Sequence, residues 1–240
     1  MNANRNSAIV TADSRERTPM SSLRKTSLAA GVLYLLTFVS IPTLTLYGSI
    51  HEANYIVGPG PDTAVNIGSV LEIIVALTGI GTAVALYPVL KKQNEGVALG
   101  FVASRVLEAA TIFAGVAFLL SVVSLRQAGA GAGDLVAGHT LVAMYDRMFL
   151  IGQSFIPGVN GLLLGYLLYK SRLVPRILPL LGFVGSVLLI AGDLAVLFGF
   201  IPQHAPSTML LAIPIAVWEF SLGIYLVVKG FKPSPITTGI

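Results

Sequence analysis

Residues 99–125 read LGFVASRVLEAATIFAGVAFLLSVVSL, an apolar stretch that only two charged side chains, Arg105 and Glu108, interrupt. At about 1.5 Å of rise per residue, a helix of this length crosses the ~30 Å hydrocarbon core of a bilayer. The apolar residues form a continuous block and do not alternate with polar ones, as they would in a half-buried strand. The stretch therefore predicts a transmembrane helix.

Comparable apolar blocks lie on both sides of this stretch. The 240-residue chain is 55% hydrophobic and 11% charged, whereas a soluble domain has about 25% charged residues to cover its core. We therefore predict one all-α domain, a polytopic membrane helix bundle with six transmembrane helices. The predicted spans are Ser27–Leu46, Ala64–Leu90, Leu99–Leu125, Leu141–Tyr169, Ile177–Phe200 and Thr208–Val228.

Polar segments flank the predicted bundle, which occupies residues 26–232. Residues 1–25 are basic and lack apolar periodicity, so we expect a disordered cytoplasmic tail. Residues 233–240 form a second, short cytoplasmic tail. No predicted element is lost if translation starts at Met20, and the sequence leaves the choice between Met1 and Met20 open. The first span is interpreted as an uncleaved anchor, because it nearly spans a bilayer and no small-x-small cleavage site follows it.

Basic residues are distributed unevenly among the connecting segments. One set of segments holds twelve of them, whereas residues 47–63, 126–140 and 201–207 hold only Arg126. This bias alternates across all six spans and predicts that both termini face the cytoplasm, in a multi-pass protein of the cell inner (cytoplasmic) membrane. The same bias explains the net charge of +4. A protein that binds nucleic acid would instead carry its basic residues on one face. The twelve residues are Arg5, Arg15, Arg17, Arg24, Lys25, Lys91, Lys92, Lys170, Arg172, Arg176, Lys229 and Lys232.

Seven ionisable residues fall inside the predicted spans. A charged side chain at mid-membrane costs at least ~2.5–3.5 kcal/mol if it faces lipid, so we expect all seven to face the bundle interior. Arg105 and Glu108 stand at i, i+3 on one helix and can pair locally. The depths of the acids permit an acidic chamber that opens outward, with the two arginines as counter-charges. The candidate interior polar site comprises Glu72, Arg105, Glu108, Asp146, Arg147, Asp193 and Glu219.

These buried charges have a functional and a structural interpretation. Carboxyl groups that share a dry interior retain protons or bind a cation, which suits a transporter or a protein that binds a small molecule or ion. Alternatively, the groups are structural ion pairs, the interpretation favoured for Arg105 and Glu108. The chain would then be a non-catalytic membrane subunit that packs with a partner. The sequence indicates no substrate and no catalytic residue.

The three histidines, His51, His139 and His204, all fall on the predicted outer side, each in a different loop. Imidazoles with a carboxylate can coordinate zinc, but none of the usual short ligand spacings is present. We therefore expect scattered loop histidines, without a metal or another cofactor. A membrane-embedded enzyme that acts on lipid through these histidines is a further alternative. The chain has no cysteine, which excludes thiolate chemistry.

Small residues recur along the fourth and fifth predicted spans. Gly158, Gly161 and Gly165 share one span, and Gly182 and Gly185 lie on the next. Such spacings allow close approach of helices, so we expect tight packing within the bundle, with a homo-oligomer interface as the alternative. A kink is expected at each of two prolines inside the spans. These are Pro157 and Pro214.

Five short motifs follow one another along the chain. They are Arg24-Lys25 before Gly31-Val-Leu-Tyr34-Leu-Leu, Asp62-Thr-Ala-x-Asn66-Ile, Leu86-Tyr87-Pro-Val-Leu90 before Ala98-Leu99, Arg105-Val-Leu-Glu108-Ala, and Pro214-x-x-x-x-Glu219 before Lys229-Gly230. In this order they resemble the bacterial multi-spanning membrane proteins grouped as domain of unknown function 4386. The resemblance covers about residues 22–232 and implies a multi-helical membrane protein without an assigned activity. It identifies Arg105, Glu108 and Glu219 as family features, together with Asp62 and Asn66, and it supplies no substrate.

Overall fold

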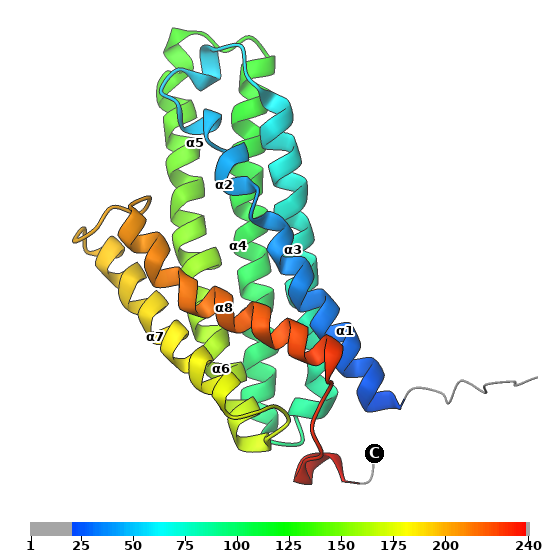
Figure 1. Cartoon of the computed structure of the whole chain (residues 1–240). Coiled ribbons are helices and arrows are strands. Elements are labelled where there is room, and N and C mark those ends of the chain that lie inside the picture. The colour runs from blue at the N-terminus through cyan, green and yellow to red at the C-terminus, as the bar shows by residue number, and fades with distance from the viewer. Residues whose placement is uncertain (1–20, 239–240) are drawn as a thin grey trace, which may run out of the picture.

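The computed structural model describes residues 21–238, and within this range every regular element is helical (Figure 1). Six helical runs are long and apolar enough to cross a membrane, which confirms the predicted all-α bundle. The expected tail up to residue 20, and with it the choice of start, lies outside the described residues. The six runs are Ser22–Leu46, Asp62–Leu90, Glu95–Gln127, Ala132–Ser171, Ile177–Leu197 and Pro206–Val228.

The first run is divided into α1 (Ser22–Leu36), a 3₁₀ segment (Thr37–Ser40) and α2 (Thr43–Leu46). The Ser21 hydroxyl accepts a hydrogen bond from the Arg24 amide at 3.3 Å and caps α1. The helix therefore begins inside the segment expected to be disordered. Pro42 has no amide hydrogen to donate, and the helical run is broken where it occurs.

Helices α3 (Asp62–Leu90) and α4 (Glu95–Gln127) form an antiparallel pair joined by a short turn. Asn94 caps α4, because its side-chain oxygen accepts the Val97 amide at 3.0 Å. The 33 residues of α4 measure about 50 Å, against about 35 Å for the 23 residues of α8 (Pro206–Val228). The pair consequently extends past the loop between α7 (Ile177–Leu197) and α8 (Figure 1).

The fourth run is one continuous rod made of α5 (Leu135–Met148), a π-helix (Phe149–Phe155) and α6 (Ile156–Ser171). Pro157 is the second residue of α6, so the expected irregularity takes the form of a π-helix directly before this proline. A π-helical turn holds an extra residue and shifts the register of the side chains that follow, and such turns are frequent at functional sites. Two residues of the π-helix, Gln153 and Ser154, contact buried acids on different helices.

Glycines allow close contact among α6, α7 and α8. A Cβ atom on Gly161 would lie 2.1 Å from the Ser186 hydroxyl, and one on Gly182 would lie 2.5 Å from the Trp218 indole. A Cβ on Gly185 would lie 2.6 Å from the Ile215 backbone nitrogen. These separations are far below van der Waals contact, so the predicted tight packing of these glycines within the bundle is confirmed.

The predicted basic segments gather at one end of the bundle, which we term the basic end. It comprises the start of α1, the α3–α4 turn, the α6–α7 connection and the end of α8 (Figure 1). The Arg24 guanidinium donates to the Leu226 carbonyl at 3.0 Å, and the Lys232 amide donates to the Leu173 carbonyl at 2.8 Å. The segment after α8 thus packs against the α6–α7 connection.

Candidate functional site

Four helices contribute one buried group of polar side chains, which we term the central cluster. It comprises Tyr34 of α1, Arg105 and Glu108 of α4, Asn160 of α6 and Glu219 of α8. Arg105 donates to both carboxylate oxygens of Glu108, at 3.2 and 2.9 Å. Through Nη2 it also donates to the Tyr34 hydroxyl at 2.9 Å and to Glu219 Oε1 at 3.2 Å. The expected local pair on α4 is therefore part of a larger network.

The remaining contacts join both carboxyls to further helices. The Asn160 amide donates to Glu108 Oε2 at 2.6 Å, and the Tyr34 hydroxyl lies 3.4 Å from Glu219 Oε1. The guanidinium of Arg105 also lies 5.4 Å from the ring centroid of Tyr34, within range of a cation–π interaction. The central cluster thus links α1, α4, α6 and α8 around one guanidinium.

Burial differs between the two carboxyl groups of the central cluster. The side chains of Arg105 and Glu108 are only 4% and 9% exposed, whereas that of Glu219 is 17% exposed. Asn160 is fully buried, and its Oδ1 has no hydrogen-bond partner among residues 21–238; the same holds for Arg105 Nε. Because buried polar atoms are normally hydrogen-bonded, the cluster has unused hydrogen-bonding capacity.

Glu72 on α3 forms a second polar site, completed by the α5–α6 rod. Its side chain is fully buried, and Oε1 accepts hydrogen bonds from the Tyr145 hydroxyl at 2.8 Å and the Gln153 amide at 3.2 Å. Oε2 is buried, and no described residue donates to it. No arginine, lysine or histidine of the described chain forms an ion pair with Glu72. An ionised Glu72 would therefore be poorly compensated.

Asp193 on α7 forms a third site of the same kind. The Ser154 hydroxyl donates to Oδ1 at 2.7 Å, while Oδ2 is buried and has no partner in the part of the chain that the structure describes. Asp193 itself is 2% exposed. Like Glu72, this acid receives a hydrogen bond from the π-helix.

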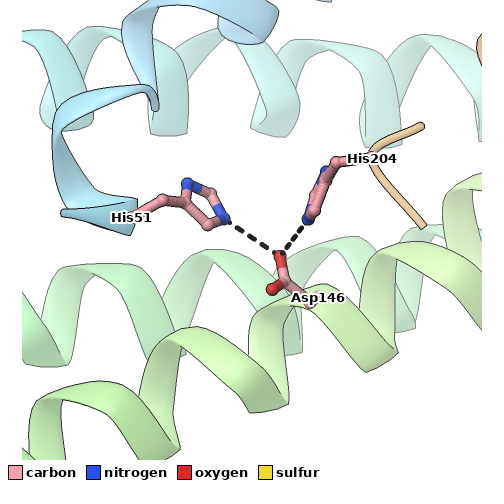
Figure 2. A group of neighbouring side chains, drawn as sticks. All are labelled: His51, Asp146 and His204. Atoms are coloured by element: carbon pink, nitrogen blue, oxygen red, sulfur yellow. Dashed lines mark hydrogen bonds and ion pairs between the residues drawn. The ribbon is translucent and has the colours of Figure 1, made fainter. Parts of the chain in front are cut away.

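Asp146, in the last turn of α5, lies beside the loop between α7 and α8 and between two histidines (Figure 2). Its Oδ1 is 3.0 Å from His51 Nε2 and 3.6 Å from His204 Nε2. The hydrogen bond to Asp146 and a second one to the Tyr47 carbonyl raise the pKa of His51, against the opposing effect of partial burial. His139 lies elsewhere, 2.7 Å from the Ala53 carbonyl. The expectation of scattered histidines therefore fails for two of the three, because a loop fold brings His51 and His204 together.

A further contact fixes the end of the bundle opposite the basic end. Asp62, at the start of α3, forms an ion pair with Arg126 near the end of α4, and the Gln127 amide also donates to Asp62 at 3.1 Å. The Tyr55 hydroxyl donates to Asp62 at 2.9 Å, and burial, followed by this carboxylate, raises the pKa of Tyr55 to about 12. Asn66 is exposed. Asp62 thus ties α3 to α4, whereas Asn66 has no comparable contact among the described residues.

The structure brings three of the seven candidate residues into direct contact, namely Arg105, Glu108 and Glu219. Glu72, Asp193 and Asp146 each bind separate partners, and within residues 21–238 no hydrogen bond or ion pair joins them to the central cluster. Arg147 is exposed and forms no ion pair in that range. The acids therefore occupy separate positions along the bundle, which differs from the single chamber that their depths permitted.

The neutral partners of these acids were not predicted from the sequence. They are Tyr34, Tyr145, Gln153, Ser154 and Asn160. Asn160 and Gln153 could have been identified from the sequence, because Asn and Gln inside an apolar stretch require interhelical hydrogen bonds. Four of these five residues lie on the α5–α6 rod, which thereby supplies a hydrogen bond to Glu72, Asp193 and Glu108.

Comparison with known families yields one match. A family model described as Domain of unknown function (DUF4386) matches residues 29–230, and this range includes every residue of the central cluster. No curated protein and no solved structure matches the chain.

Proposed function

Since the chain belongs to the family described as Domain of unknown function (DUF4386), we propose that this integral membrane protein is a proton transporter that exchanges a proton at its central cluster. The proton resides on one of the two carboxyl groups that share Arg105, namely Glu108 and Glu219, and it is exchanged through Glu219.

The observation that carries the proposal is the charge balance of the central cluster. One guanidinium, Arg105, contacts two carboxyl groups, Glu108 and Glu219. If both carboxyls were ionised, a net negative charge would be buried among apolar helices, which is strongly unfavourable. One proton or small cation restores neutrality. Glu219 is the exchanging group, because its side chain is the more exposed of the two.

The other buried acids supply further positions for a proton. The α5–α6 rod contacts Glu72 through Tyr145, Asp193 through Ser154 and Glu108 through Asn160. At about 1.5 Å of rise per residue, Tyr145 and Asn160 are about 22 Å apart along this rod. The acids therefore lie at successive positions along the rod. Buried acids arranged in this way form the proton relays of membrane pumps and transporters.

The packing of the central cluster favours a proton over a bulky ligand at this position. Arg105, Glu108, Asn160 and Tyr34 are all buried. Two surface hollows lie away from the cluster, along Pro233–Thr238 and beside His139. The cluster therefore suits a proton or a bare cation.

The test measures proton movement directly. Purified protein is reconstituted into vesicles that contain a pH-sensitive dye, and a pH gradient is imposed. Wild-type protein is expected to dissipate the gradient faster than empty vesicles do, and Glu219→Gln is expected to abolish this flux. Glu95→Gln, which changes an exposed acid at the start of α4, is the matched control and retains the flux. Wild-type flux equal to that of empty vesicles, or unchanged flux in Glu219→Gln, rejects the proposal.

A second measurement detects the proton at its site. Infrared difference spectra between acidic and alkaline pH contain a band from protonated carboxyl groups. This band is expected to lose intensity in Glu219→Gln and to be unchanged in Glu95→Gln. An unchanged band in Glu219→Gln contradicts the assignment of the exchanging group.

We further propose that the basic end faces the cytoplasm and that the protein resides in the inner membrane of a bacterium. The accumulation of Lys and Arg in the segments at that end supports this orientation. Alkaline phosphatase inserted after Gly131 is expected to be active, and a fluorescent protein fused after residue 240 is expected to fluoresce. An inactive phosphatase after Gly131 together with a non-fluorescent fusion after residue 240 would show that the opposite orientation is correct.

A further inference from the structure

Two histidines and one carboxylate converge at the loop between α7 and α8, on the side of the bundle away from the basic end. His51 follows α2, Asp146 lies in the last turn of α5, and His204 belongs to the loop between α7 and α8 (Figure 2). We propose that His51, Asp146 and His204 form a binding site for a divalent transition-metal ion, with Zn²⁺ as the ion best suited to these ligands. We refer to the three residues as the His–Asp–His site.

The distances match a metal site of this type. One ligand atom from each residue lies within 4.8 Å of the other two. Zinc binds imidazole nitrogen and carboxylate oxygen at about 2.0–2.2 Å in tetrahedral geometry, so neighbouring ligand atoms are about 3.3 Å apart. The two nitrogen–oxygen separations here are 3.0 and 3.6 Å, on either side of this value.

Hydrogen bonds alone explain only half of the arrangement. His51 Nε2 lies at hydrogen-bond distance from Asp146 Oδ1, but His204 Nε2, at 3.6 Å, is too far for a normal hydrogen bond. His204 nevertheless turns its Nε2 toward this oxygen (Figure 2). A metal cation placed among the two Nε2 atoms and Asp146 Oδ1 would bind all three. Only the exposed side chain of His204 would have to move slightly.

The surrounding contacts orient two of the three ligands. His51 Nδ1 lies 2.8 Å from the Tyr47 carbonyl. When Nδ1 carries the proton and donates it to this carbonyl, the lone pair on Nε2 is free to bind a metal, the usual support of a metal-ligating histidine. The Gln203 side chain donates to the backbone carbonyl of Asp146 at 2.7 Å and holds the loop that carries His204 against α5.

The ligand set also predicts the kind of metal site. Three protein ligands leave a fourth tetrahedral position for water or an anionic ligand group, as in zinc sites that are not purely structural. The His204 side chain is 67% exposed, so this position is open to solvent. A bound ion would also fasten the α7–α8 loop to α5 and to the segment after α2, which belong to three separate runs of the chain.

The experiment uses the full-length protein in detergent after treatment with a chelator. Co²⁺, which replaces Zn²⁺ and is coloured in tetrahedral sites, is titrated first, and Zn²⁺ is then added to displace it. Wild-type protein is expected to bind one equivalent and to develop the tetrahedral Co²⁺ spectrum. His51→Ala, His204→Ala and Asp146→Asn are each expected to weaken binding by at least ~100-fold, since even the loss of a supporting contact costs 10–100-fold.

His139→Ala is the matched control, because His139 contacts a backbone carbonyl away from this site. It is expected to bind Co²⁺ as the wild type does. Thermal unfolding of each variant without metal shows whether it is folded, and Zn²⁺ is expected to raise the melting temperature of the wild type and of His139→Ala only. Wild-type binding no tighter than that of His51→Ala/His204→Ala, or an equal loss in His139→Ala, overturns the proposal. Because these variants leave Glu219 intact, the outcome is independent of the proton-flux test.

Discussion

The guanidinium Nη2 of Arg105 lies 3.2 Å from Oε1 of Glu219, although 114 positions separate the two residues in the chain. The same guanidinium contacts Glu108 one turn further along α4. Arg105 thus joins α4 to α8 and is the cation in ion-pair contact with both carboxyl groups. The energetics of the bundle interior and the proposed proton exchange both depend on this arrangement.

The first prediction concerns this shared cation. Arg105→Gln leaves two buried carboxyl groups without a positive partner, and removal of one member of a buried ion pair typically costs about 3–5 kcal/mol. We expect a decrease of this size in the free energy of unfolding, measured by titration with a denaturing detergent. The exposed Lys92→Gln serves as control and is expected to change stability by less than ~0.5 kcal/mol.

The double variant Arg105→Gln/Glu219→Gln tests the coupling. Because it removes one of the two uncompensated carboxylates, its loss of stability is expected to be smaller than the sum of the single losses by about 1–3 kcal/mol. Strict additivity of the two single effects would show that Arg105 and Glu219 do not interact energetically.

The second prediction concerns Glu72. Tyr145→Phe removes only the hydroxyl that donates to Glu72 Oε1 at 2.8 Å, while the Gln153 amide still donates to the same oxygen at 3.2 Å, and the loss of one such hydrogen bond costs about 0.5–1.5 kcal/mol. We expect a loss of stability in this range, together with a shift of the carboxyl band of Glu72 in the infrared spectrum. Tyr166→Phe, at a position that is 37% exposed, is the matched control and is expected to alter neither quantity. Equal effects in the two variants would refute a specific role for the Tyr145 hydroxyl.

Much of the fold could be predicted from the sequence, because a membrane span is decided by composition over a long window. The predicted start of the second span, Ala64, differs by two residues from the observed Asp62. The pairing of Arg105 with Glu108 was also predictable, since three residues place both side chains on one face of a helix.

The partners supplied by other helices could not be predicted in the same way. Tyr34 and Asn160 reach the cluster because α1 and α6 pack against neighbouring helices in one particular rotation, which apolar blocks do not encode. The π-helix before Pro157 changes the side-chain register without a recognisable spacing in the sequence. The meeting of His51 with His204 depends on the paths of two loops. The order of residues along one helix could therefore be read from the sequence, whereas their partners on other helices could not.

The third prediction concerns the pH dependence of the His51–Asp146 pair in metal-free protein. The pKa of His51 is raised in the folded state, principally by the hydrogen bond to Asp146, with His204 as the other titratable neighbour. A raised pKa means that the protonated form is stabilised. The contribution is therefore fully present below the unfolded value of about 6.5 and is lost as the pH rises through the folded value.

We expect wild-type protein to be more stable than His51→Ala at about pH 5.5, and the difference to shrink by about pH 8.5. Because the His51 side chain is 31% exposed, the effect should not exceed ~1 kcal/mol. Thermal unfolding in the presence of a chelator measures it, with His139→Ala as the control histidine. A difference that grows with increasing pH would contradict the assigned direction.

The last prediction concerns the contact between α7 and α8. An added Cβ at Gly185 would lie 2.6 Å from the backbone nitrogen of Ile215 and 2.7 Å from its Cα, and backbone atoms cannot turn aside as a side chain can. Gly185→Ala is therefore expected to separate the two helices and to destabilise the protein by about 1–3 kcal/mol. Gly100 lies within α4, where an added Cβ meets nothing within 4 Å. Gly100→Ala should be neutral or stabilise the protein by up to ~1 kcal/mol, because alanine favours a helix more than glycine does. Unfolding in detergent measures both variants side by side. Changes of opposite sign in the free energy of unfolding support a packing role for Gly185. Equal changes in the two variants would mean that helix propensity alone explains both.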